Sequence, residues 1–226
     1  MHTLLDPQFG NKMVTLMAAF VLVLQIAMVA QRWIITNIRL FAAQSILLAA
    51  IAGTIAFYNH APHIYAVAVA TLLAKGILVP IVLERLVGRI EIRQEIEPIL
   101  NMPLSIVISG GLTLVAYVVG ASFYHPATGE ASLGHNTLAV AISVFLMGFF
   151  MMLNRRKALS QVVALLTLEN GVFLAAICLT YGMPLIVELG VFFDVLVAVL
   201  VLGILVFRIR ESFESMDVSK LRRLRG

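Results

Sequence analysis

The sequence predicts an all-α membrane protein, a bundle of about seven transmembrane helices with the N-terminus outside and the C-terminus in the cytoplasm. Of its 226 residues, 61% are hydrophobic and only 12% are charged, and the mean hydropathy is +1.01. These values exclude an ordinary soluble domain. Seven apolar runs are each long enough to cross a hydrocarbon core of about 30 Å. The runs are apolar on every face, whereas strands of a membrane β-barrel alternate apolar and polar residues.

The seven runs follow one another with short polar connections between them. They are Met13–Ala30, Arg39–Tyr58, His63–Leu83, Ile99–Phe123, Asn136–Leu153, Ala158–Thr180 and Pro184–Phe207. A helix is expected for each, because it satisfies the backbone hydrogen bonds of a segment internally in lipid. After the third run, Glu84–Glu97 alternates four acids and three arginines. This pattern is typical of a solvated helical extension, and a docking surface for a peripheral partner is the alternative.

Basic residues predict the orientation of the chain. They gather after the first, third and fifth runs and in the C-terminal tail, at Arg32, Arg39, Arg85, Arg89, Arg93, Arg155, Arg156, Lys157, Arg208, Arg210, Lys220, Arg222, Arg223 and Arg225. The other three connections contain no Lys or Arg. Because short cytoplasmic loops are enriched in Lys and Arg, the formal net charge of +4 is interpreted as a topology signal. No nucleic-acid motif accompanies it.

Three ionisable side chains lie near the middle of apolar runs: Lys75, Glu169 and Asp194. Inserting such a group costs roughly 2.5–3.5 kcal/mol, so intramembrane charges are functional by default. At about 15 Å from each surface, Lys75 cannot reach water and is expected to face the protein interior. We predict that the three form a proton relay, and a structural pair of acids that locks two helices is the alternative. Glu188, one turn inside the last run, is a candidate proton exit or a headgroup-level side chain.

Further polar or helix-breaking residues surround these positions. Pro80 follows Lys75 by five residues and removes a backbone hydrogen bond to Gly76, which can open the helix to water. Gln25 and Gln44 are candidate polar extensions of the relay, and interhelical hydrogen bonding is the alternative. The single cysteine, Cys178, is interpreted as a structural thiol. The sequence predicts neither a metal site nor a bound cofactor.

The last three runs carry an ordered set of motifs. These are the basic loop Asn154-Arg155-Arg156-Lys157, the stretch Ala164-Leu165-Leu166-Thr167-Leu168-Glu169-Asn170, Asp194, and the tail segments Met216-Asp217-Val218-Ser219 and Leu224-Arg225-Gly226. Residues 136–226 thereby resemble the NuoK-type subunit of respiratory complex I. The resemblance implies that Glu169 and Asp194 occupy the places of two membrane-embedded glutamates on the proton path. Aspartate in the second place keeps the carboxyl but shortens its reach by one methylene.

A NuoK-type subunit has three spans, so residues 1–135 are predicted to be a four-helix extension of a three-helix unit at 136–226 with a basic tail. Leu47–Ala52 resembles Phe173–Cys178, which indicates a weak internal repeat of spans one to three in spans five to seven. Chance similarity between apolar helices is the alternative. With its extension, the chain resembles component E of hydrogenase-4 and of related formate hydrogenlyase complexes.

That resemblance implies a non-redox, non-catalytic subunit in a bacterial or archaeal cell membrane, contributing buried carboxylates to proton translocation or coupling. The implied partners are antiporter-like membrane subunits, a subunit that anchors the peripheral arm and, through it, a nickel–iron hydrogenase with iron–sulfur proteins. Membrane lipid is the other expected contact. A subunit of a multi-component cation/proton antiporter and a purely structural scaffold remain as alternatives. An independent transporter is disfavoured, because no broken-helix substrate site is visible. The sequence leaves open whether protons or sodium ions move.

Overall fold

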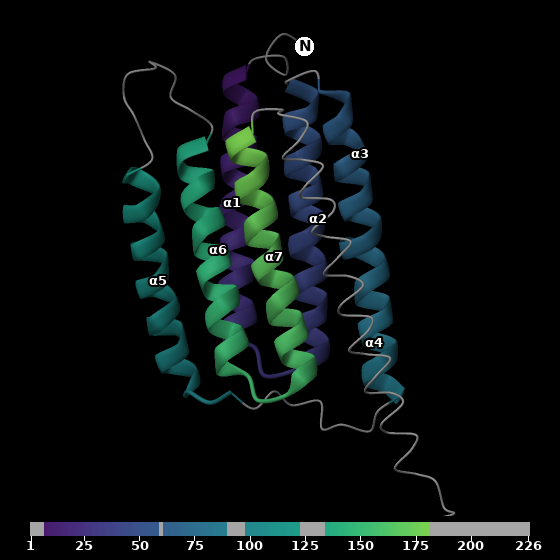
Figure 1. Cartoon of the computed structure of the whole chain (residues 1–226), viewed down its shortest axis with the longest axis vertical. Helices are drawn as coiled ribbons and strands as arrows, with labels where there is room; N and C mark the ends of the chain where they lie inside the picture. Colours follow the sequence, from purple (N-terminus) through teal and green to yellow (C-terminus); the bar gives the residue numbers. More distant parts are fainter. Residues whose placement is uncertain (1–6, 59–60, 90–97, 123–133, 181–226) are drawn as a thin grey trace, which may run out of the picture. The chain divides into compact units, whose positions relative to one another are not determined.

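The computed structural model describes residues 7–58, 61–89, 98–122 and 134–180, and these residues are almost entirely helical (Figure 1). Six of the described helical segments are long and apolar enough to cross a membrane. The protein is therefore an all-α, multi-span membrane protein. The described residues all belong to one compact unit, Met1–Val191. The seventh predicted run, Pro184–Phe207, lies outside the described residues.

The helices begin and end close to the predicted runs. They are α1 (Pro7–Ala30), α2 (Ile34–Tyr58), α3 (Pro62–Thr71), η2 (Leu72–Leu78), α4 (Val79–Arg89), α5 (Met102–Ser122), α6 (Gly134–Asn154) and α7 (Ala158–Thr180). The bounds of α7 match the prediction, and α3, η2 and α4 together make the third span. Arg39, expected to mark a helix start, lies inside α2. A polar side chain within about one turn of a helix end can still reach the membrane surface.

Helix α2 lies centrally in the unit. It packs against α1 on one side, against α3, η2 and α4 on another, and against α7, while α6 contacts α1, α5 and α7. The α1–α2 and α6–α7 connections, the end of α4 and the start of α5 meet at one end (Figure 1). We call it the basic end, because it carries Arg32, Arg85, Arg155, Arg156 and Lys157, and we call the opposite end the outer end. This shared end fits the predicted alternation of loops, and the orientation in a membrane remains a prediction.

Helices α6 and α7 pack backbone to backbone through two glycines. A Cβ atom added to Gly148 would lie 2.6 Å from the backbone nitrogen of Leu168, and one added to Gly171 would lie 2.5 Å from that of Phe145. Real side chains cannot occupy such positions, so both glycines are required by this close approach. Small residues allow membrane helices to pack in this way. The tight pair fixes the part of α7 that carries Glu169.

The third span changes its helical winding at its middle. Leu72–Leu78 forms a π-helix, and the N–H of Val79 donates to the carbonyl of Ala74, five residues earlier. Pro80 follows directly; it has no N–H to donate, and its ring clashes with a carbonyl four residues before it in an α-helix. The wider π-turn relieves that clash. From the sequence, Pro80 was expected to remove a backbone hydrogen bond and open the helix. The structure shows a π-turn instead, with Lys75 in its middle.

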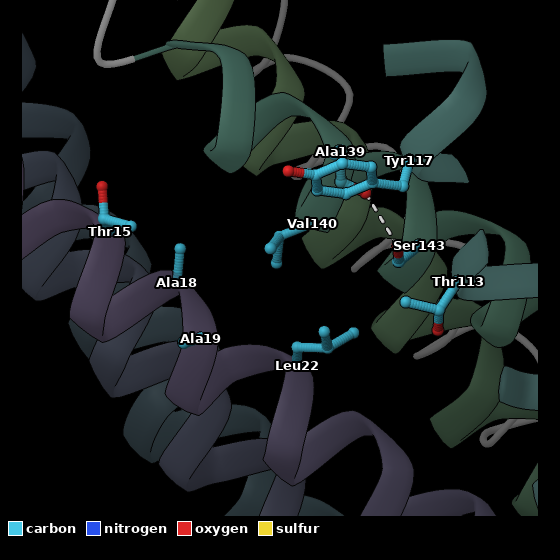
Figure 2. Close-up of a pocket in the computed structure, with 9 residues that line it drawn as sticks. All are labelled: Thr15, Ala18, Ala19, Leu22, Thr113, Tyr117, Ala139, Val140 and Ser143. Carbon is cyan, nitrogen blue, oxygen red and sulfur yellow. Dashed lines mark hydrogen bonds between the residues drawn. The ribbon is translucent and has the colours of Figure 1, made fainter. Parts of the chain in front are cut away.

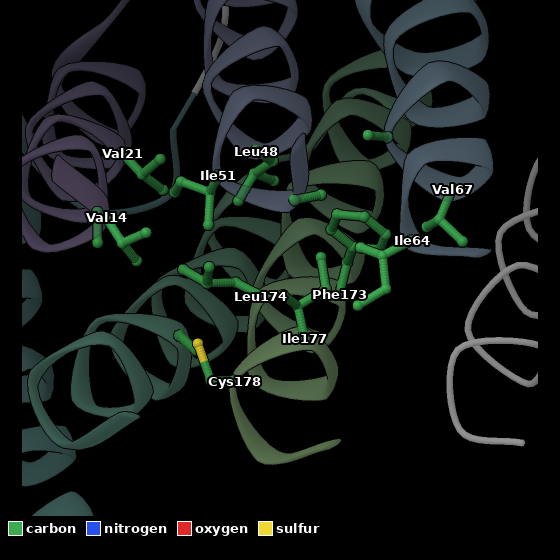
Figure 3. Packing of buried hydrophobic residues seen from close by; sticks show 14 of the residues in the cluster. Val14, Val21, Leu48, Ile51, Ile64, Val67, Phe173, Leu174, Ile177 and Cys178 are labelled. Carbon is green, nitrogen blue, oxygen red and sulfur yellow. The ribbon is translucent and has the colours of Figure 1, made fainter. Parts of the chain in front are cut away.

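A cluster of buried apolar side chains packs between α1, α2, α3, α6 and α7 (Figure 3). In these helices it lies toward the outer end. We call it the outer core. Its members include Val14, Ala18 and Val21 of α1, Leu48, Ile51, Ala52 and Ala56 of α2, Ile64, Val67 and Ala68 of α3, and Phe173, Leu174, Ile177 and Cys178 of α7. Cys178 thus has the structural surroundings that the sequence predicted. The buried residues Gln25, Gln44, Lys75 and Glu169 lie on the basic-end side of this cluster in their helices.

Candidate functional site

Lys75 and Glu169 form a buried ion pair between η2 and α7. The Lys75 Nζ atom lies 3.3 Å from Glu169 Oε1, and the two side chains are 5% and 2% exposed. The ammonium also lies 5.6 Å from the centroid of the Phe173 ring, a cation–π distance. Lys75 therefore faces the protein interior, as its depth in the sequence predicted. The role of the pair in a relay remains a prediction.

Three buried amides extend from the residue next to Glu169. The Asn170 amide donates to Gln44 Oε1 at 3.1 Å and to Ser45 Oγ at 3.2 Å. The Gln44 amide donates to Gln25 Oε1 at 2.9 Å. All of these side chains are fully buried. We call Asn170, Gln44 and Gln25 the amide chain. Gln25 and Gln44 are thus hydrogen-bonded across helices, which was the alternative reading of these two residues.

The amide chain and the ion pair meet on α7. Successive residues of an α-helix point about 100° apart, so Glu169 faces η2 while its neighbour Asn170 faces α2. At the far end, the Gln25 amide donates to the Met151 sulfur of α6 at 3.5 Å. The polar groups therefore connect η2, α7, α2, α1 and α6 in one buried network. Such a network in low dielectric is strong when its members are paired and costly when one is removed.

The basic end holds a second buried cation, Arg155, in the α6–α7 connection. Its Nη2 atom donates to the carbonyls of Met28 at 3.1 Å and Val29 at 3.2 Å, and Nη1 donates to that of Gln31 at 3.4 Å. The guanidinium therefore caps the C-terminus of α1, where a cation is favoured by the helix dipole. Burial lowers the pKa of Arg155 to about 10, so the group stays charged at neutral pH. From the sequence, Arg155 was a topology signal and a member of the basic-loop motif, and this capping role was not predicted.

Asn154, next to Arg155, joins α6 to the start of α5. Its backbone carbonyl accepts from the N–H of Ile99 at 2.8 Å, and its side-chain oxygen accepts from the N–H of Leu100 at 2.8 Å. Its side-chain amide donates to Ser105 Oγ at 3.0 Å. The motif Asn154-Arg155 thus holds the helix ends of the basic end together. Its residues act on backbone groups, which is a structural role.

A cavity of about 240 Å³ lies elsewhere, between α1, α5 and α6 (Figure 2). Its lining includes two hydroxyls that donate within their own helices, Ser143 to the Ala139 carbonyl at 2.8 Å and Thr113 to the Ser109 carbonyl at 2.9 Å. The remaining walls are mostly small apolar side chains such as Ala18. None of its lining residues belongs to the ion pair or the amide chain. We therefore assign the candidate site to the buried polar network.

The structure brings together some of the predicted site residues and leaves others untested. Lys75 and Glu169 are in contact, whereas Asp194 and Glu188 lie outside the described residues. Asn170 and Ser45 were not predicted to belong to the site. Asn170 could have been noticed as an amide beside a buried acid within an apolar run. Among the described residues, no group of three or more His, Cys, Asp or Glu side chains could hold a metal ion.

Comparisons with known proteins identify relatives of similar length. No protein-family model matches the chain, and no solved structure matches it significantly. Hydrogenase-4 component E of Escherichia coli K12 is 29% identical over 189 residues, covering 82% of this chain and 85% of the relative. The protein named Uncharacterized protein Rv0085 of Mycobacterium tuberculosis is 37% identical over 189 residues, covering 83% of this chain and 84% of the relative. The chain therefore belongs to the same family as Rv0085 and is a homologue of hydrogenase-4 component E.

Proposed function

We propose that this protein is a non-redox membrane subunit of a hydrogenase-related complex and that its Lys75–Glu169 pair takes part in proton translocation or coupling. The observation that carries the proposal is one base and one acid in direct contact inside a membrane-spanning bundle. The similarity to hydrogenase-4 component E along most of the chain supports the type of complex. Antiporter-like subunits and a peripheral-arm anchor are the proposed neighbours, in a bacterial or archaeal cell membrane.

The chemistry of the pair suits a proton-transfer site. A lysine ammonium and a glutamate carboxylate in contact can exist as an ion pair or, after one proton moves from nitrogen to oxygen, as a neutral pair. In low dielectric the balance between these forms depends on hydration and on nearby charges. A movement at η2 or α7 can therefore load or release a proton. Asp194 is proposed as a second acid of the same relay, and Glu188 as an exit group.

A structural scaffold is the second candidate, and one observation favours it. Lys75 and Glu169 neutralise each other, and their contact joins η2 to α7, as a helix-locking pair would. The two roles differ in what they require of the side chains. A scaffold needs only matched groups, whereas a relay needs groups that accept and release protons.

Substitutions that keep the side-chain volume but remove the ability to bind and release a proton distinguish the relay from the scaffold. We would compare Glu169→Gln and the double variant Lys75→Met/Glu169→Gln in membrane vesicles, measuring substrate-driven proton uptake per electron transferred. A relay predicts that both variants assemble and lose coupling, whereas a scaffold predicts that the charge-free double variant retains it. Arg39→Ala, which removes an exposed ion pair with Glu84, serves as the matched control. Blue-native gels would test the first half of the proposal, which fails if the chain does not migrate with hydrogenase and iron–sulfur subunits.

A further inference from the structure

In four spans of the bundle, a group of buried apolar residues and a buried polar residue occupy different depths. In α1, α2, α3–η2 and α7 alike, the outer core occupies the turns toward the outer end, and the buried polar residue lies on its basic-end side. In α7, for example, Glu169 and Asn170 come before Phe173, and in the third span Lys75 comes after Ala68. Within the described residues, apolar side chains of these four spans thus lie between the ion pair and the outer end.

On the opposite side, the amide chain leads from the pair toward the basic end. Gln44 lies ten residues after the start of α2, and Gln25 lies five residues before the end of α1. At about 1.5 Å per residue, these positions are roughly 15 Å and 7.5 Å from the basic end. The amide chain therefore comes closer to the basic end as it passes from Gln44 to Gln25. Arg155, bound to the carbonyls of Met28 and Val29, lies just beyond it.

Asn37 supplies an independent observation on the same side. It lies in the first turn of α2, seven residues before Gln44, so the two side chains share one face of the helix. Asn37 is fully buried, and within the described residues neither atom of its side-chain amide has a hydrogen-bond partner. Buried amides in native proteins are almost always paired, and where protein groups do not pair them an ordered water does. Asn37 thus indicates an internal water site near the basic end.

We propose that water enters the bundle from the basic end along α2, binding at Asn37 and beside the amide chain, and that this water exchanges protons with the Lys75–Glu169 pair from the basic end. An amide does not pass a proton on by itself, so the mobile carrier is water held by these groups. A hydronium ion that arrives gives its proton to the Glu169 carboxylate and leaves as water. This inference rests on the proposed function for its meaning in transport, while the water sites themselves are tested without activity.

Hydroxyl-radical labelling by X-ray radiolysis of the assembled membrane complex tests the route directly, because internal water becomes the oxidant where it lies. Met151 accepts the Gln25 amide, and Met147 lies one turn away on the same helix. Both are buried from bulk solvent, at 1% and 0% exposure, so they form a matched pair. We expect Met151 to be converted to its sulfoxide roughly tenfold faster than Met147. Equal and slow oxidation of both would overturn the proposal.

Thiol accessibility provides the second test and shows the side of entry. A dry buried thiol is inert, because only the hydrated thiolate reacts. In membrane vesicles, Asn37→Cys should react with a membrane-impermeant thiol reagent roughly tenfold faster from the basic side than Ile38→Cys does. Cys178, in the outer core, serves as the internal dry control. Equal rates for the two variants, or faster reaction from the outer side, would contradict the proposal.

The two proposals fail in different ways. Labelling of Met151 with normal coupling in Glu169→Gln would reject the relay and keep the water route. Loss of coupling in Glu169→Gln with no labelling of Met151 would keep the relay and reject entry from the basic end. If Asn37→Cys does not assemble, radiolysis of the unmodified protein still decides the question.

Discussion

Two buried cations, Lys75 and Arg155, occupy different surroundings in the same bundle. Lys75 contacts a carboxylate in the middle of the membrane-spanning region, whereas Arg155 donates to three backbone carbonyls at the basic end. Both are less than 5% exposed. Burial alone therefore does not identify a proton-handling group. The partner of the buried cation identifies such a group, because a carboxylate can change its charge and a backbone carbonyl cannot.

The side chains match these surroundings. A guanidinium is planar, presents several donors in a fixed arrangement and keeps its proton, so it can span the last carbonyls of a helix. An ammonium is a compact charge that binds one acid closely and can give up a proton when buried. The difference separates a structural cation from a candidate relay cation. Substitutions at these two cations, at the amide chain and at a surface ion pair test the comparison, in order of decreasing expected effect.

The largest effect is expected when the ion pair loses one charge. Lys75→Met should lower the free energy of unfolding by about 3–5 kcal/mol, because it leaves a buried carboxyl without its cation. The double variant Lys75→Met/Glu169→Gln should recover most of this loss, since no buried charge remains. Thermal unfolding of the purified complex would measure both. A double variant as unstable as the single one would mean that the pair contributes by packing and not by charge.

Arg155→Leu should cost about 3 kcal/mol, because several charge-assisted hydrogen bonds at the end of α1 are lost. Arg155→Lys should recover only part of this, since one ammonium cannot reach three carbonyls with good geometry. The difference in unfolding free energy from the unmodified protein should stay constant from about pH 5 to about pH 9. The folded pKa of about 10 and the still higher pKa of an exposed arginine both lie above that window. Denaturant unfolding of the variant and the unmodified protein at several pH values measures this difference in stability. A difference that varies across this window would give Arg155 a titrating role.

Asn170→Leu should cost about 1–2 kcal/mol, because it leaves the Gln44 and Ser45 oxygens buried without their donor. Thr167→Val is the control: Thr167 is also buried in α7, but it donates only to the Val163 carbonyl of its own helix. The control should cost less than about 0.5 kcal/mol. Thermal unfolding compares the two. Equal costs would indicate that the amide chain adds no stability beyond local packing.

The smallest effect is expected at the surface pair. Arg39 Nε lies 3.0 Å from Glu84 Oε1, with side chains 71% and 38% exposed. Solvent screens such a pair, so Arg39→Ala should change the free energy of unfolding by less than about 0.5 kcal/mol. Proton coupling should also stay unchanged. A large loss of assembly in this variant would instead reveal a contact with a neighbouring subunit.

The sequence predicted the helices well because long apolar runs leave few alternatives. It placed α7 at its observed bounds and identified Pro80 as a helix-disturbing residue, but it did not predict the π-turn. Depth in the membrane also predicted that Lys75 faces inward, since a lipid-facing lysine at that depth cannot reach water. Helix existence and depth are local properties, and local patterns are enough to predict them.

The pairing of side chains could not be predicted in this way. A helix that is apolar all round does not show which face turns inward, so nothing local indicated that Asn170 would meet Gln44 or that Glu169 would meet Lys75. Arg155 could not be distinguished from Arg156, because both lie in the same basic loop. These contacts depend on the rotation of each helix about its axis. In α6 and α7 that rotation is set by the close approach at Gly148 and Gly171.

The π-turn in the third span has a consequence for the register of the whole segment. A π-turn holds about one residue more than an α-turn, so the faces of residues 62–71 and 79–89 are offset by about 100° compared with an uninterrupted helix. The π-turn thus sets which side chains of the third span face the same neighbouring helix. Deleting one residue between Leu72 and Lys75 would make the span one regular α-helix. The side chains on one side of the deletion would then rotate by about 100° and contact different neighbours. Length, and not only side-chain chemistry, is therefore under constraint at this point of the chain.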